Sequence, residues 1–144
     1  MVRPLGSAEQ GLRRWFAPAA AVGFALFLVA VIYAANQGIR HPGHLLVEAL
    51  PYGDKFGHAG LWGAMTVIGN LAVRRWVHLS VGPARRLPVP LVSLVLCVIV
   101  SMEEASQFFF ANRTLDAVDL LANFVGITLG SLIFRLFVPP PGAP

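Results

Sequence analysis

The chain has 144 residues, of which 56% are hydrophobic and only 12% are charged, with a formal net charge of +4. Charged residues make up about a quarter of a soluble domain, so this composition excludes an ordinary water-soluble surface. The positive charge does not indicate nucleic acid binding, because the arginines flank long apolar runs and form no basic face or binding motif.

Four apolar stretches are long enough to cross a bilayer, which takes about 20 residues of helix. They cover residues 15–35, 56–73, 88–110 and 117–138. The sequence therefore predicts an all-α fold, a four-span transmembrane helical bundle over residues 15–138. We expect residues 1–14 to form an N-terminal tail and the proline-rich residues 139–144 to form a disordered tail.

The first apolar stretch has an alternative interpretation. Arg13-Arg14-Trp15-Phe16 followed by an apolar run is typical of a cleaved signal peptide. The run is about 19 residues, however, which is longer than the usual apolar region of about 7–15 residues in such peptides. We therefore expect a membrane anchor, and a signal peptide remains the alternative.

The arginines predict the orientation. Eight of the eleven basic residues lie in the N-terminal tail, in the connection between the second and third stretches, or near the C-terminus. The other three are Arg40, Lys55 and Arg113. Basic residues favour the cytoplasmic side, so both termini are expected in the cytoplasm of a plasma (inner) membrane protein. Val81–Pro90, which is rich in proline and arginine, is expected to be a cytoplasmic loop.

Six of the seven acidic residues, all except Glu9, lie in or near the half of the bundle that this orientation turns outward. Charged groups in a span cost about 2.5–3.5 kcal/mol each, so they usually face the bundle interior. Helical spacing places the last polar set on one stripe that continues into two glycines: Asp116, Asp119, Asn123, Gly126 and Gly130. The glycines predict close helix packing, as do Gly57, Gly60 and Gly63.

Arg113 is the expected central cation of this polar half, between Glu104 and Asp119, because arginine can pair with carboxylates through two hydrogen bonds. Two interpretations stay open. The polar residues can form a structural ion-pair network between helices, or they can form a polar pocket that opens at the outer face.

Three groups of these residues carry a family resemblance: Asp54-Lys55-x-x-His58 with Trp62, then Glu104-x-x-Gln107, then Arg113-x-x-Asp116-x-x-Asp119-x-x-x-Asn123-x-x-Gly126. In order and spacing they resemble the VanZ-like family of small membrane proteins. Members of that family often have tyrosine where this chain has Trp62. The resemblance covers about half of the chain and implies a four-helix membrane fold. It also implies an association with teicoplanin (glycopeptide antibiotic) resistance, without an established activity.

We hypothesise that the polar site acts on or binds an envelope lipid or glycan. The candidate catalytic residues are His58, Glu104 and Asp119, since histidine titrates near neutral pH and carboxylates can orient it. The candidate binding residues are Asp54, Lys55, Gln107, Arg113, Asp116 and Asn123. Lys55 and Arg113 are suited to an anionic head group.

Two further functions stay open: a non-enzymatic accessory or binding protein, and a small transporter, which the lack of an inverted repeat disfavours. Whether the chain is an enzyme is not determined by its sequence. We predict no metal site, because His41-Pro42-Gly43-His44 is too short for a zinc pair. A divalent cation at His58, Asp54, Glu104 and Asp119 stays possible, but no spacing in the sequence demands it. The sequence does not indicate a cofactor. The expected partners are membrane lipids and an envelope ligand. The oligomeric state is open.

Overall fold

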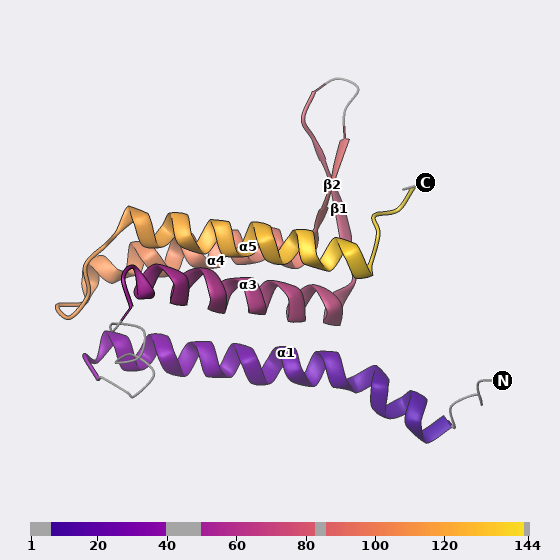
Figure 1. Cartoon of the computed structure of the whole chain (residues 1–144), viewed down its shortest axis with the longest axis horizontal. Helices are drawn as coiled ribbons and strands as arrows, with labels where there is room; N and C mark the ends of the chain where they lie inside the picture. The colour runs from indigo at the N-terminus through magenta and orange to yellow at the C-terminus, as the bar shows by residue number, and fades with distance from the viewer. Residues whose placement is uncertain (1–6, 40–49, 83–85, 143–144) are drawn as a thin grey trace.

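The computed structural model describes residues 7–39, 50–82 and 86–142. Figure 1 shows long helices that lie side by side along one direction, and a hairpin that projects sideways near one end. Within the described ranges the elements are α1 (Ser7–Asn36), α3 (Gly53–Val73), β1 (Trp76–Ser80), β2 (Arg86–Pro90), α4 (Leu91–Ser106), the 3-10 helix η1 (Gln107–Phe109) and α5 (Ala117–Phe137). The predicted helical bundle is therefore confirmed, with a hairpin added to it.

Three of these helices are long and apolar enough to cross a membrane, over Trp15–Asn36, Leu91–Phe109 and Ala117–Phe137. Many of their large apolar side chains are exposed, such as Leu26 and Phe27 on α1, Val98 on α4 and Leu129 on α5. Water disfavours such a continuous apolar surface, whereas lipid tails accept it. The chain is therefore a membrane protein. Helix α3 has the right length for a span but is not among the three.

Helix α1 begins at Ser7, eight residues before the first expected span, so residues 7–14 are helical rather than part of a tail. The last helix ends at Phe137, close to the expected end at residue 138 and before the run of prolines that starts at Pro139. Proline lacks a backbone donor and cannot continue a helix, which explains this end. Residues 1–6 and 143–144 of the two expected tails lie outside the described residues.

Helices α3 and α5 pack closely because α5 has glycines on the face that contacts α3. A Cβ atom added at Gly126 would overlap the carbonyl oxygen of Ala59, and one at Gly130 would lie 2.5 Å from that of Gly63. The predicted close approach at Gly126 and Gly130 is thus confirmed, and Gly63 takes part in it. Gly60 does not, since a Cβ atom there would have no neighbour within 4 Å.

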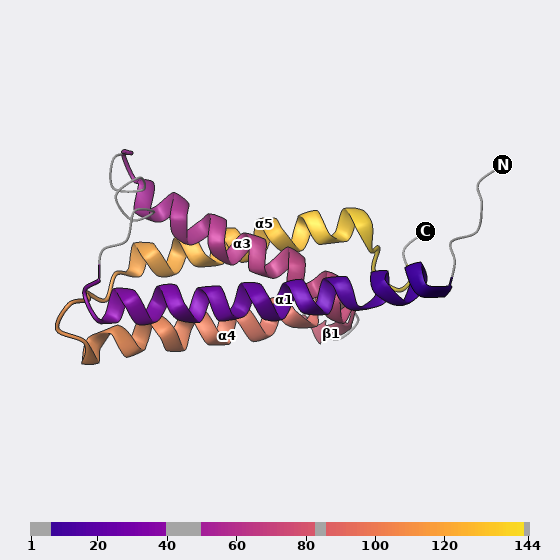
Figure 2. The ribbon, with the colours of Figure 1, turned by 90° about the horizontal axis from the view of Figure 1, so that it is seen from below.

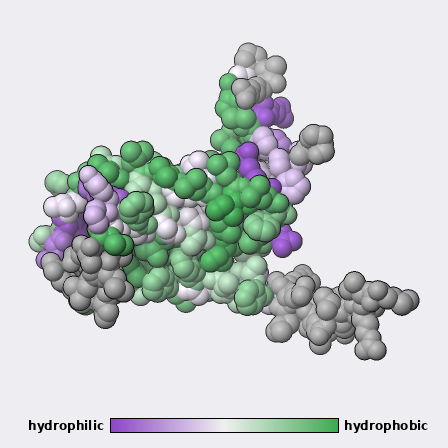
Figure 3. Space-filling view, in the orientation of Figure 1, coloured by the Kyte–Doolittle hydropathy of each residue, from purple (hydrophilic) through white to green (hydrophobic). Residues whose placement is uncertain are grey.

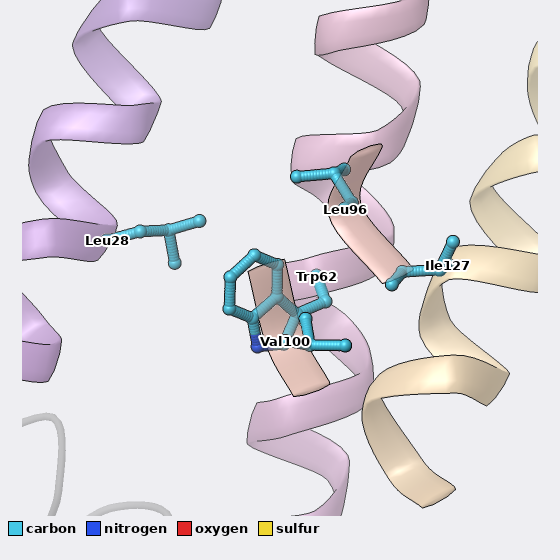
Figure 4. Packing of buried hydrophobic residues seen from close by; sticks show 5 residues of the cluster. All are labelled: Leu28, Trp62, Leu96, Val100 and Ile127. Carbon is cyan, nitrogen blue, oxygen red and sulfur yellow. The ribbon is translucent and has the colours of Figure 1, made fainter. Parts of the chain in front are cut away.

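The four α-helices of the described residues all contribute to one apolar core, whose buried members Figure 4 shows: Leu28, Trp62, Leu96, Val100 and Ile127. Trp62 is only 6% exposed and lies among side chains of the other helices. Toward the hairpin end, polar groups also join the helices. Asn70 Nδ2 donates to Ser93 Oγ at 2.9 Å, and Ser131 Oγ lies 2.7 Å from the same Ser93 Oγ.

The segment Val81–Pro90, expected to be a loop, contains half of a β-hairpin, so the fold is mostly rather than entirely helical. Strand β1 pairs antiparallel with β2, from Trp76 opposite Pro90 to Ser80 opposite Arg86. Strand β2 contains Pro88 and Pro90, which have no N–H to donate. A two-stranded ribbon tolerates them because each strand has an open outer edge. Helix α4 starts directly after Pro90.

The chain has two polar ends separated by an apolar belt. The start of α1, the end of α5 and the hairpin lie toward one end (Figures 1 and 2). The starts of α3 and α5 and the end of α4 lie at the other. Figure 3 shows hydrophilic residues near both ends and mostly hydrophobic residues between them, as a bilayer requires.

Candidate functional site

The polar residues predicted from the sequence meet at the end of the bundle opposite the hairpin. The first turns of α3 bring Asp54, Lys55 and His58, and the start of α5 brings Asp119 and Asn123. Asp116 is the N-cap of α5, where its side chain accepts a hydrogen bond from the backbone N–H of Val118 at 2.8 Å. Such a cap satisfies a backbone donor that the helix itself leaves free.

Lys55, and not Arg113, is the central cation of the site. Its Nζ lies 2.9 Å from Asp54 Oδ2, 2.7 Å from Asp116 Oδ2 and 2.5 Å from Asp119 Oδ1. The expectation that Arg113 pairs with Glu104 and Asp119 is wrong. The ammonium group carries three donors and reaches three carboxylates that two helix starts place around it. We call these four residues the Lys55 cluster.

His58 lies one helical turn after Asp54 and is held by α5. Its Nδ1 lies 3.0 Å from Oδ1 of Asn123, and its Nε2 lies 3.9 Å from Oδ2 of Asp119. The imidazole remains 25% exposed. A partly exposed imidazole that is oriented by an amide can accept a proton from a bound molecule or donate one to it.

Asn123 is wholly buried, yet one of the two polar atoms of its side chain has no hydrogen-bond partner among the described residues. The Oδ1 atom meets His58, while Nδ2 has no hydrogen-bond partner among the described residues. If the two amide atoms are exchanged, Nδ2 faces the histidine and Oδ1 is left over instead. A buried amide atom without a partner costs about 1–3 kcal/mol, and an added molecule can recover it.

Glu104 lies at the junction between the end of α4 and the start of α5. It is 2% exposed, its Oε1 accepts the backbone N–H of Asp116 at 2.7 Å, and its Oε2 accepts Gln107 Nε2 at 3.0 Å. The carboxylate therefore fixes the start of α5 against the end of α4. Gln107 is equally buried and serves the same junction.

Arg113 and Glu103 form a second pair at this junction. Nη2 of Arg113 lies 3.5 Å from Oε1 of Glu103, which also lies 3.3 Å from Gln107 Nε2. The sequence placed Glu103 in the polar half without a role of its own. The sequence feature that indicates its contact with Gln107 is the i,i+4 spacing of the two residues, which puts both side chains on one face of the helix.

Among the described residues, this end of the bundle carries excess negative charge. In the Lys55 cluster one positive group faces three negative groups, which leaves two negative charges. Hydrogen bonds from Lys55 Nζ and from the Val118 backbone N–H hold the pKa of Asp116 below its usual value. Asp116 is therefore ionised at neutral pH.

In the described part of the chain, no group of three or more His, Cys, Asp or Glu residues is arranged to hold a metal ion. His41 and His44 lie outside the described residues. An open groove of about 460 Å³ lies elsewhere, on the α4–α5 face, and is lined by Cys97, Val98, Ser101, Met102, Ala105 and Phe124. Its lining is largely apolar.

Comparison with known proteins adds no relative to this picture. A scan against protein-family models, a search of the curated proteins and a search of the solved structures each found no match to the chain.

Proposed function

We propose that the chain is a four-span plasma (inner) membrane protein of the VanZ-like type, with both termini in the cytoplasm and α3 as the additional span. Helix α3 has 21 residues, or about 31 Å at the usual rise of a helix. It packs against α1, α4 and α5. The excess of basic residues near the hairpin and the termini supports the cytoplasmic placement of that end.

The polar content of α3 is compatible with a span because neighbouring helices provide partners. Lys55 meets three carboxylates, His58 meets Asn123, and Asn70 meets Ser93. Polar groups in membrane helices usually face the bundle interior and pair there. The low hydropathy of α3 thus follows from its central place.

Thiol labelling tests this topology. In a Cys97→Ala background, Thr114→Cys at the site end and Ser80→Cys at the hairpin end place single thiols at exposed positions. A membrane-impermeant maleimide applied to intact spheroplasts should label Thr114→Cys, and should label Ser80→Cys only after lysis. The reverse pattern, or labelling of both positions before lysis, would contradict the proposed orientation.

We further propose that the outward end binds the polar part of an envelope lipid or glycan. The observation that carries this proposal is the wholly buried Asn123 amide, whose Nδ2 has no partner among the described residues and which lies beside the partly exposed His58. A ligand hydroxyl or carbonyl would satisfy that amide, while the imidazole would bond to a neighbouring ligand group.

The charge of the site favours one class of ligand. Lys55 is already neutralised by carboxylates, and Arg113 faces Glu103, so neither cation is free to hold a phosphate. The two surplus negative charges of the Lys55 cluster repel anions and attract amines. We therefore favour a head group or glycan rich in hydroxyl or amino groups over the anionic head group expected from the sequence.

His58 is the residue to which we assign any proton transfer, because its ring is partly exposed and oriented by Asn123 and Asp119. Glu104 is assigned a positioning role, since both of its oxygens are occupied at the α4–α5 junction. A non-enzymatic accessory protein would use the same site geometry to bind the ligand, and no reaction would follow. The association with teicoplanin resistance stays a proposal that rests on the family resemblance.

The test is to purify the protein from its own membranes in mild detergent and to identify bound lipids and glycolipids by mass spectrometry. We expect Asn123→Leu and His58→Phe to lose a ligand that the unchanged protein retains. His78→Phe is the matched control, because it makes the same change at the opposite end of the bundle.

Protein abundance and teicoplanin susceptibility complete this experiment. Loss of ligand at unchanged abundance supports a binding site. Equal loss of ligand and abundance in both site variants would mean that the cluster is structural. If susceptibility changes in His58→Phe while ligand stays bound, a chemical role of the imidazole is favoured over simple binding.

A further inference from the structure

The β1–β2 hairpin has one apolar and one polar face. Successive residues of a strand point to opposite faces, and directly paired residues share a face. The register pairs Val77 with Val89 and Leu79 with Leu87, so four branched apolar side chains lie on one face. The other face carries Trp76 and Pro90, then His78 and Pro88, then Ser80 and Arg86.

The base of the hairpin is fixed to the bundle. The ring of Trp76 lies 5.5 Å from that of Phe134, and the guanidinium of Arg135 lies 5.5 Å above the same indole. Arg135 Nη2 also donates to the carbonyl oxygen of Pro88 at 2.5 Å. The hairpin therefore has a defined direction from the end of α5.

That direction is across the helices. The hairpin projects sideways near the end of the bundle, and in the turned view it is seen nearly end-on (Figures 1 and 2). In a bundle whose helices cross a membrane, this places the hairpin along the membrane surface. In Figure 3 hydrophobic residues lie on the side of the hairpin that faces the length of the bundle, and hydrophilic residues gather on its other side.

Among the described residues, the outer half of the apolar face is only partly covered by the chain. Leu79 and Leu87 are each 38% exposed, and Val81 beyond them is 52% exposed. A lone two-stranded hairpin is marginally stable in water, so a surface that accepts these side chains would stabilise it. The segment from Arg74 to Pro90 contains four arginines and no acidic residue, which fits a negatively charged surface.

We propose that the hairpin lies on the anionic lipid surface of the membrane that the bundle spans, with Leu79 and Leu87 inserted between lipids and Arg75 and Arg86 near the phosphates. Interfacial tryptophan and arginine side chains are typical of this depth, and Trp76 with Arg135 stands at the base. This inference rests on the proposed membrane arrangement and is independent of the ligand at the opposite end.

An environment-sensitive fluorophore tests the inference. In the Cys97→Ala background, the label is attached at Leu79→Cys or Leu87→Cys, and His78→Cys is the matched position on the other face. The labelled protein is reconstituted into vesicles of phosphatidylcholine mixed with phosphatidylglycerol, and into vesicles of phosphatidylcholine alone. We expect blue-shifted emission and severalfold weaker iodide quenching at Leu79 and Leu87 than at His78, most clearly in the mixed vesicles.

Three outcomes would overturn the proposal. Equal iodide quenching on both faces would show that the apolar face is in water. Equal protection in the two kinds of vesicle, unchanged by Arg75→Gln with Arg86→Gln, would rule out the anionic lipid. Protection that increases with the protein-to-lipid ratio would show that a second copy covers the face.

A label at Val98→Cys separates this inference from the proposed membrane arrangement. Val98 is 60% exposed on the apolar side of α4 and should be in lipid whenever the bundle spans the bilayer. Lipid at Val98 with water at Leu79 would contradict the hairpin inference alone. Water at both positions would contradict the membrane arrangement itself.

Discussion

Lys55 Nζ on α3 lies 2.5 Å from Asp119 Oδ1 on α5, although 64 residues separate the two along the chain. Replacing Lys55 with methionine should leave Asp119, which is 15% exposed, without its cation. We expect a loss of about 1–2 kcal/mol in unfolding free energy, because the remaining solvent exposure weakens the pair. Thermal unfolding in detergent measures it.

Lys55→Arg is the control for this prediction, because it keeps the charge and changes only the shape of the donor. It should lose clearly less stability than Lys55→Met. Equal stability of the unchanged protein and Lys55→Met would show that the Lys55 cluster does not hold α3 to α5.

Gly126→Ala should separate α3 from α5. The added methyl would overlap the Ala59 carbonyl oxygen, which is backbone and cannot rotate away. Overpacking of this kind costs about 1–3 kcal/mol. Gly60→Ala adds the same methyl on α3 where nothing lies within 4 Å, and it should leave the melting temperature unchanged. Similar melting temperatures for the two variants would contradict the close contact.

Asp116→Asn should change how stability depends on pH. The folded-state pKa of Asp116 is lowered, so its ionised form adds stability above the usual value of 3.8, and this is lost as the pH falls through the lowered folded value. Asparagine can still cap α5 but cannot pair with Lys55. The melting temperature of the variant should lie below that of the unchanged protein at pH 7, and the gap should close in strong acid. A constant gap would contradict the assignment.

Glu104→Ala should lower protein abundance rather than ligand binding alone. It removes the acceptor of the Asp116 N–H and of Gln107 Nε2, both at a buried junction, which costs about 2–3 kcal/mol. Glu103→Ala is the comparison, because its contacts of 3.3–3.5 Å are longer and its loss should be smaller. Normal abundance with lost ligand in Glu104→Ala would instead place this carboxylate in the binding site.

The sequence predicted the helices and most members of the site because both depend on simple periodicity. Apolar runs of span length mark α1, α4 and α5, and the stripe from Asp116 to Gly130 predicts which face of α5 meets another helix. The sequence did not predict correctly which cation lies at the centre of the site. Lys55 and Arg113 are both near acids in the sequence, and only the packed starts of α3 and α5 decide that Lys55 reaches three of them.

The hairpin was missed for a related reason. Two prolines in β2 argue against a strand, and the rule against them holds for strands paired on both sides. Trp76 stabilises the strand through contacts with Phe134 and Arg135, which lie far along the chain and come close only when the helices pack. Local sequence contains no sign of that contact.

The central place of α3 has a consequence for the biogenesis of the protein. Helix α5 provides partners for Lys55 and His58 and packs against α3 at Gly126 and Gly130. It is synthesised more than forty residues after α3. Until α5 emerges from the ribosome, α3 is too polar to enter lipid at low cost. If α3 is the additional span that we propose, its insertion should therefore wait for α5, and a chain truncated before α5 should leave α3 outside the bilayer.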